Sequence, residues 1–131
     1  MTISGGKCNT TSGTYSFIGG GQLNVTSGGH STISAGYGNG AYGCMSVVSG
    51  GQANTASANH STIVGGRANA ASGACSFIGG GYSNSASGVC STLGGGVGNN
   101  ASGCSSFIGG CIGNLTTSFG SVIVTNSTTY N

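Results

Sequence analysis

Apolar and polar residues recur along this chain with a period of 15. We write the sequence in rows of 15 starting at Met1 and number the columns accordingly. Column 3 holds a branched aliphatic residue in every row: Ile3, Ile18, Ile33, Val48, Ile63, Ile78, Leu93, Ile108 and Ile123. Because successive side chains of a strand point to opposite faces, column 3 is predicted to face a core and column 2 to face outward.

Column 9 is almost invariant as well, and several other columns hold small residues. Column 9 holds Asn9, Asn24, Asn39, Asn54, Asn69, Asn84, Asn99 and Asn114. Column 11 is Ala or Thr and is expected to point inward, while columns 5, 6 and 13 are mostly Gly. We expect the Gly residues of all three columns to supply the positive φ that tight corners need. Asn favours turns, and stacked Asn amides can also hydrogen-bond to one another. We therefore expect an asparagine ladder, with a simple turn preference as the alternative.

This period predicts an all-β fold, a parallel β-solenoid (β-roll). Fifteen residues are too few for the helical units of common solenoids, but they suit one coil of two short strands and two turns. About eight to nine coils stacked at ~4.8 Å would give a rod ~40 Å long. The repeat covers residues 1–124, and residues 125–131 depart from it as a terminal cap or exit segment. The columns leave the handedness open.

Column 2 supplies a candidate interface. It alternates Thr with bulky apolar residues, namely Phe17, Val47, Phe77, Phe107 and Val122. Only one aliphatic and one small residue per coil would face the core, so a single rod lacks burial and neighbouring copies are expected to supply it. Apolar side chains in an exposed stripe indicate an interface. The alternative is a solvent-facing stripe that merely favours strand-forming residues.

The composition argues against several classes of function. The 131 residues include 30 Gly, no Pro, and no Asp or Glu, and the only Lys and Arg are Lys7 and Arg67. A chain with so little charge lacks the basic surface that binds nucleic acid. Without an 18-residue apolar run, it is not expected to insert into a membrane. Without carboxylates, paired-acid hydrolysis and Ser-His-Asp triads are not possible. We expect no enzymatic activity and no catalytic, cofactor-binding or metal-binding residues.

Both histidines and two of the six cysteines lie in column 15. His30 and His60 lie two coils apart, ~10 Å at the assumed rise, too far to share one zinc ion. Cys75 and Cys90 are consecutive in this column, so their Cα atoms should be ~5 Å apart, within the range that a disulfide needs. We predict a Cys75–Cys90 disulfide, which implies an oxidising environment. Cys104 lies one column away in the next coil and could compete for Cys90.

The repeats resemble the head-domain repeats of trimeric autotransporter adhesins. The segments "STIVGGRANAASGAC" (61–75) and "SFIGGGYSNSASGVC" (76–90) look like a version of that coil lengthened by one residue. The Ser-Gly-Asn repeats also resemble those of phage and large-virus fibre proteins. The resemblance implies a left-handed β-roll and a side-by-side homotrimer. The chain departs from the adhesin pattern in its period, in its column of Asn, and in lacking a coiled-coil stalk or membrane anchor.

Three functions are compatible with these features. The first is a structural protein: the rod of a trimeric virion fibre or spike, which contacts other structural proteins of the particle. The N-terminal "MTISGGKCNT" lacks the features of a secretory signal, which favours the viral alternative over a secreted one or indicates a mature or partial chain. The second is a cell-surface adhesin or extracellular filament subunit. The third is an ice-binding solenoid, since "STI" recurs at Ser31, Ser61 and Ser91, although Phe interrupts the Thr in column 2.

Overall fold

The computed structural model describes residues 1–124 as a parallel β-solenoid, which confirms the predicted fold class. Within this range there are two parallel sheets and no helix. Each full coil contributes one two-residue strand to each sheet. The predicted segment 125–131 lies outside the described residues. The left-handed sense and the trimer implied by the resemblance stay predictions.

The strands alternate between the two sheets along the chain. The nine-stranded sheet consists of β1 (Thr2–Ile3), β3 (Phe17–Ile18), β5 (Thr32–Ile33), β7 (Val47–Val48), β9 (Thr62–Ile63), β11 (Phe77–Ile78), β13 (Thr92–Leu93), β15 (Phe107–Ile108) and β17 (Val122–Ile123). The eight-stranded sheet consists of β2 (Thr10–Thr11), β4 (Val25–Thr26), β6 (Gly40–Ala41), β8 (Thr55–Ala56), β10 (Ala70–Ala71), β12 (Ser85–Ala86), β14 (Asn100–Ala101) and β16 (Leu115–Thr116).

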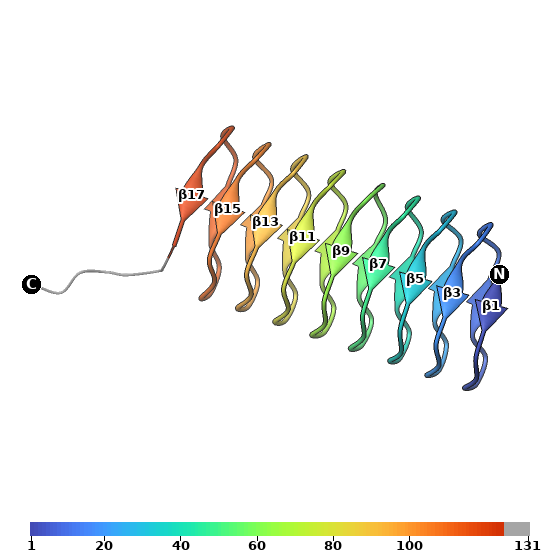
Figure 1. The fold of residues 1–131 in the computed structure, drawn as a ribbon. Helices are drawn as coiled ribbons and strands as arrows, with labels where there is room; N and C mark the ends of the chain where they lie inside the picture. Colours follow the sequence, from blue (N-terminus) through green and yellow to red (C-terminus); the bar gives the residue numbers. More distant parts are fainter. Residues whose placement is uncertain (125–131) are drawn as a thin grey trace, which may run out of the picture.

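The coils follow one another along a rod (Figure 1), with β1 at one end and β17 at the other. Every strand pairs in parallel with the strand 15 residues further on, so that Ile18 is in register with Ile33 and Ala56 with Ala71. Column 7 forms a third ladder of single-residue bridges that runs from Lys7 to Ile112. The prediction of two strands per coil missed this third side. It gives each coil three sides and three corners.

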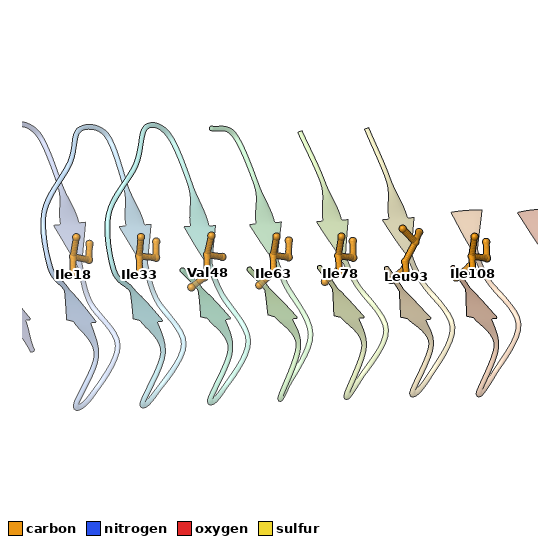
Figure 2. Close-up of a cluster of buried hydrophobic side chains, with 12 residues drawn as sticks. Ile18, Ile33, Val48, Ile63, Ile78, Leu93 and Ile108 are labelled. Carbon is orange, nitrogen blue, oxygen red and sulfur yellow. The ribbon is translucent and has the colours of Figure 1, made fainter. Parts of the chain in front are cut away.

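One file of aliphatic side chains forms the core. Their Cα atoms are paired coil by coil, and the side chains stack in one line (Figure 2): Ile18, Ile33, Val48, Ile63, Ile78, Leu93 and Ile108. All seven are fully buried. The alanines of column 11 pack against them from the eight-stranded sheet, and they are equally buried. At the ends of the rod Ile3 is exposed and Ile123 is partly buried, because each lacks a coil on one side.

The glycine columns play different roles, and the prediction that all of them supply positive φ was wrong. Column 6 does so: Gly66 has φ +84°, and a Cβ there would lie 2.2 Å from the Gly81 carbonyl oxygen. Column 13 needs Gly because adjacent coils approach each other closely there. A Cβ on Gly73 would lie 2.0 Å from the Gly88 carbonyl oxygen. Column 5 is under neither constraint, since a Cβ on Gly65 would meet nothing within 4 Å.

Apart from Gly110 in column 5, the remaining positive φ angles fall on columns 8 and 15, mostly on residues other than Gly. In column 8, Ala68 has φ +56°, and in column 15, His60 has φ +60°. This conformation turns the backbone N–H toward the preceding coil: Ala68 donates to the Gln52 carbonyl at 2.9 Å, and His60 donates to the Cys44 carbonyl at 2.9 Å. Most other ladder bonds run to the following coil. These two columns therefore tie each coil to both of its neighbours.

Candidate functional site

The candidate site is the outer surface of the nine-stranded sheet, which we call the column-2 face. Phe17, Phe77 and Phe107 are each 37–38% exposed, and Val122 is 62% exposed. Val47 and the intervening Thr32, Thr62 and Thr92 are half-buried. From β3 to β15 the core residues of the same strands are fully buried, so the predicted alternation between the inner and outer faces is present in the structure. From Phe17 to Phe107 the bulky members occupy alternate coils, and about 9.6 Å separates one from the next at the usual strand spacing. Val122 lies in the coil directly after Phe107.

Each phenylalanine of the column-2 face is preceded by Ser and followed by Ile and Gly. This Gly, in column 4, lies beside the phenyl ring in β3 and β11. A Cβ added to Gly19 would lie 3.3 Å from Cε1 of Phe17, and one added to Gly79 would lie 3.7 Å from Cε1 of Phe77. The phenyl ring therefore leans along its own strand over the glycine, and this covers part of the ring. The rest of the ring remains exposed on the column-2 face.

The predicted asparagine ladder is present in the structure as a continuous hydrogen-bonded file inside the rod. Asn69 is almost fully buried. Its Oδ1 accepts a hydrogen bond from the backbone N–H of Asn84 at 3.0 Å. Its Nδ2 donates to the carbonyl of Gly65 in its own coil at 3.1 Å and to the carbonyl of Gly81 in the next coil at 3.0 Å. The Asn side chain thus satisfies the polar backbone of the glycine corner, which the alternative of a simple turn preference does not require.

The asparagines themselves are not in the left-handed conformation, because the residue before them takes it. The ladder begins at Asn9, which donates to Gly5 and Gly21, and it ends at Asn114, whose backbone N–H donates to Oδ1 of Asn99 at 2.9 Å. From Asn69 onward the amides also bond directly to one another, as in the bond from Asn84 Nδ2 to Asn69 Oδ1 at 3.1 Å. The file stabilises the rod, because the side chains from Asn24 to Asn99 both donate and accept hydrogen bonds within it.

The column-15 corner carries the residues with the most reactive side chains. His30 stacks on Tyr15 of the preceding coil, with ring centroids 5.1 Å apart, and His60 lies two coils further along the rod. All six cysteines are free thiols, including Cys75 and Cys90, so the predicted disulfide is not formed in this structure. Five of them are exposed, and Cys104 is half-buried.

The surroundings of Cys90 change the acidity of its thiol. Partial desolvation raises the pKa of this thiol above the ordinary value. Charge repulsion from Cys75 raises this pKa further, and charge repulsion from Cys104 adds to it. Cys75 and Cys104 therefore both act on Cys90 from the neighbouring coils.

The described part of the chain offers little for small ligands. No pocket is hollowed into residues 1–124. No three His or Cys side chains in this range lie close enough together to hold a metal ion. Over the same residues, no helix has the length and apolar character needed to cross a membrane. The surfaces that stand out are the column-2 face and the column-15 corner.

Comparisons with known proteins leave the family open. No protein-family model matches the sequence, and no curated protein matches it either. The functional argument therefore depends on the two surfaces described above.

Proposed function

We propose that this chain is a structural protein, a homotrimeric β-solenoid rod that forms part of a virion fibre or spike. The observation that carries the proposal is the row of partly exposed Phe and Val side chains on the column-2 face. Three phenylalanines in one row on a thin rod leave apolar surface that a second surface of the same kind would cover. The proposed location is the virion surface, in contact with other structural proteins of the particle.

A closed trimer fits the spacing of this row. When three rods are related by rotation about an axis parallel to them, identical residues lie at the same height. Phe17, Val47, Phe77 and Phe107 would then form apolar layers every second coil, separated by layers of Thr. Aromatic pairs within such layers contribute about 0.5–1.5 kcal/mol beyond their burial. The near absence of charge also supports close association, since one chain carries a net charge of only +2.

Sedimentation equilibrium under reducing conditions tests the trimer. We expect a mass near three times 12.4 kDa for the unmodified chain. The double variant Phe77→Thr, Phe107→Thr places in these two coils the residue that already occupies alternate coils, and we expect it to sediment as a monomer. The control is Tyr15→Asn, which removes an exposed aromatic side chain at the column-15 corner, puts there a residue that tolerates the positive φ of this position, and should leave the trimer intact. A monomeric unmodified chain would contradict the proposal.

The same rod also suits a cell-surface adhesin or an extracellular filament subunit. The discriminating observation is the partner chain in an intact particle or on an intact cell surface. Ice binding is a third candidate, because Thr32, Thr62 and Thr92 lie on the column-2 face in alternate coils. The phenylalanines between them break the flat array of Thr that ice would contact. Thermal hysteresis in a solution of the purified protein would favour ice binding over the fibre.

A further inference from the structure

Three cysteines approach one another on one corner of the rod. Cys75 and Cys90 occupy column 15 of consecutive coils, and Cys104 occupies column 14 of the next coil. Cys75 and Cys90 have nearly the same backbone conformation, with φ +57° and +54°. The stacking of the coils fixes their separation: Cys90 donates its backbone N–H to the Ala74 carbonyl at 2.8 Å. Their Cα–Cβ bonds are therefore directed alike, with Cα atoms ~4.8 Å apart at the usual strand spacing.

Side chains in this column contact their neighbours in the adjacent coils. The stacking of His30 on Tyr15 shows this for two large side chains. The backbone bond from Cys90 to Ala74 stacks the two cysteine positions in the same way. Both thiols are exposed, so a soluble oxidant can reach them. A disulfide needs Cα atoms 4.4–6.8 Å apart, and the stacking distance falls within this range.

We propose that Cys75 and Cys90 form an oxidation site, which closes to a disulfide between two coils, and that Cys104 is its exchange partner. The oxidant is a low-molecular-weight disulfide. The thiolate of one cysteine attacks a sulfur of that disulfide, giving a mixed disulfide and releasing one small thiol. The thiolate of the other cysteine then attacks the protein sulfur and releases the second small thiol. In total two protein thiols are oxidised and one small disulfide is reduced to two thiols.

Cys104 allows the bond to move along the rod without further oxidation. Its thiolate attacks the Cys90 sulfur, the bond between Cys75 and Cys90 breaks, and Cys75 leaves as a thiolate. Thiol–disulfide exchange proceeds by this attack of a thiolate on a disulfide sulfur, and exposed disulfides are the more readily reduced ones. The site therefore gives the rod a covalent connection between coils that responds to the redox conditions around it.

Peptide mapping tests the site directly. The reduced protein is incubated with oxidised glutathione, its free thiols are alkylated, and the denatured chain is cut with trypsin and chymotrypsin. Cleavage after Arg67, Phe77, Tyr82, Leu93 and Phe107 puts each thiol in its own peptide. We expect residues 68–77 to be linked to residues 83–93 as the main product, and residues 83–93 to residues 94–107 as a minor one. Finding no link between residues 68–77 and 83–93 would overturn the proposal.

Variants and thermal unfolding supply the second readout. Closing a loop of this length should raise Tm by roughly 10 °C on oxidation. Cys90→Ser should abolish this rise, whereas the control Cys44→Ser, at the same corner but outside the trio, should retain it. Cys104→Ser should lose only the minor link. On non-reducing gels the oxidised protein should run at monomer mass, and bands of cross-linked chains in place of the internal link would contradict the proposal. None of these readouts requires the trimer, so they remain informative if the proposed function fails.

Discussion

At the scale of single residues, the buried side chains of columns 3 and 9 stack on the equivalent residues one coil away. The asparagine of column 9 shows what this repetition achieves. Its buried amide donates to two carbonyls of the glycine corners and accepts from the backbone N–H of the next asparagine. Buried polar groups that lose their partners cost ~1–3 kcal/mol each. A single asparagine therefore stabilises its own coil and the next one.

Asn69→Ala should destabilise the rod by roughly 3 kcal/mol, because it leaves the carbonyls of Gly65 and Gly81 and the N–H of Asn84 without this partner. The measurement is urea unfolding followed by circular dichroism. Ser72→Ala, an exposed change in the same coil, is the matched control and should alter the unfolding free energy by less than about 0.5 kcal/mol. Equal effects of the two substitutions would show that the ladder contributes nothing.

Two adjacent glycines should respond very differently to the same change. Gly66→Ala requires a side chain at φ +84° and a Cβ that collides with the Gly81 carbonyl, so we expect a loss of more than about 2 kcal/mol. Gly65→Ala meets open space at an ordinary φ and should be neutral within about 0.5 kcal/mol. Thermal unfolding of both variants measures the difference. A harmless Gly66→Ala would be incompatible with the close approach of the coils.

At the scale of the element, the strands are only two residues long and gain stability by stacking. Isolated pairs of such strands would not persist in water. Burial of the aliphatic file is what holds the coils in register, because a shift of one residue would move every column-3 side chain to the outer face. The stability of each strand therefore depends on having a coil on either side.

Ile63→Ala in β9 should cost about 3 kcal/mol, since it removes a fully buried side chain from the middle of the file. Ile3→Ala in β1 deletes the same atoms where the side chain is 40% exposed, and it should cost about 1 kcal/mol or less. Chemical unfolding of the two variants gives the comparison. If both cost the same, the core is not a stack with weak ends.

The sequence predicted the parts of the coil in which the side chain decides the structure. Ile, Asn and Ala recur in columns 3, 9 and 11 because these side chains are buried and each packs or bonds with its counterpart. The bulky column-2 residues were recognised by the alternation of strand faces. The side chains of this face stand partly in solvent, yet their residue types repeat every second coil.

The sequence did not predict the features that depend on backbone packing between coils rather than on the type of side chain. The third ladder, in column 7, holds Lys, Gln, Tyr, Arg, Val and Ile, so no residue type marks it. Columns 8 and 15 take positive φ with Ala, Leu, Tyr, His, Met, Ser and Cys, which on their own disfavour this conformation. Stacking on the neighbouring coils imposes it. In these two columns, the residue type indicates a positive φ only at Gly38, Gly98, Gly113 and Gly120.

At the scale of the whole molecule, the absence of acidic side chains should remove the usual cause of acid unfolding. Carboxylates with depressed pKa values stabilise a fold at neutral pH, and this stability is lost as the pH falls through those values. This chain contains no Asp or Glu. We therefore expect the urea midpoint to change little between pH 5 and pH 3. A steep loss of stability over this interval would mean that another titrating group supports the fold.

The central claim, that rods of stacked coils associate side by side, is tested most directly by small-angle X-ray scattering on the eluting peak of a sizing column under reducing conditions. This measurement gives mass and length together. We predict a mass near three times 12.4 kDa with a particle length close to that of a single rod, ~40 Å. A mass of one chain, or a threefold mass with a length near ~120 Å from end-to-end stacking, would contradict the account.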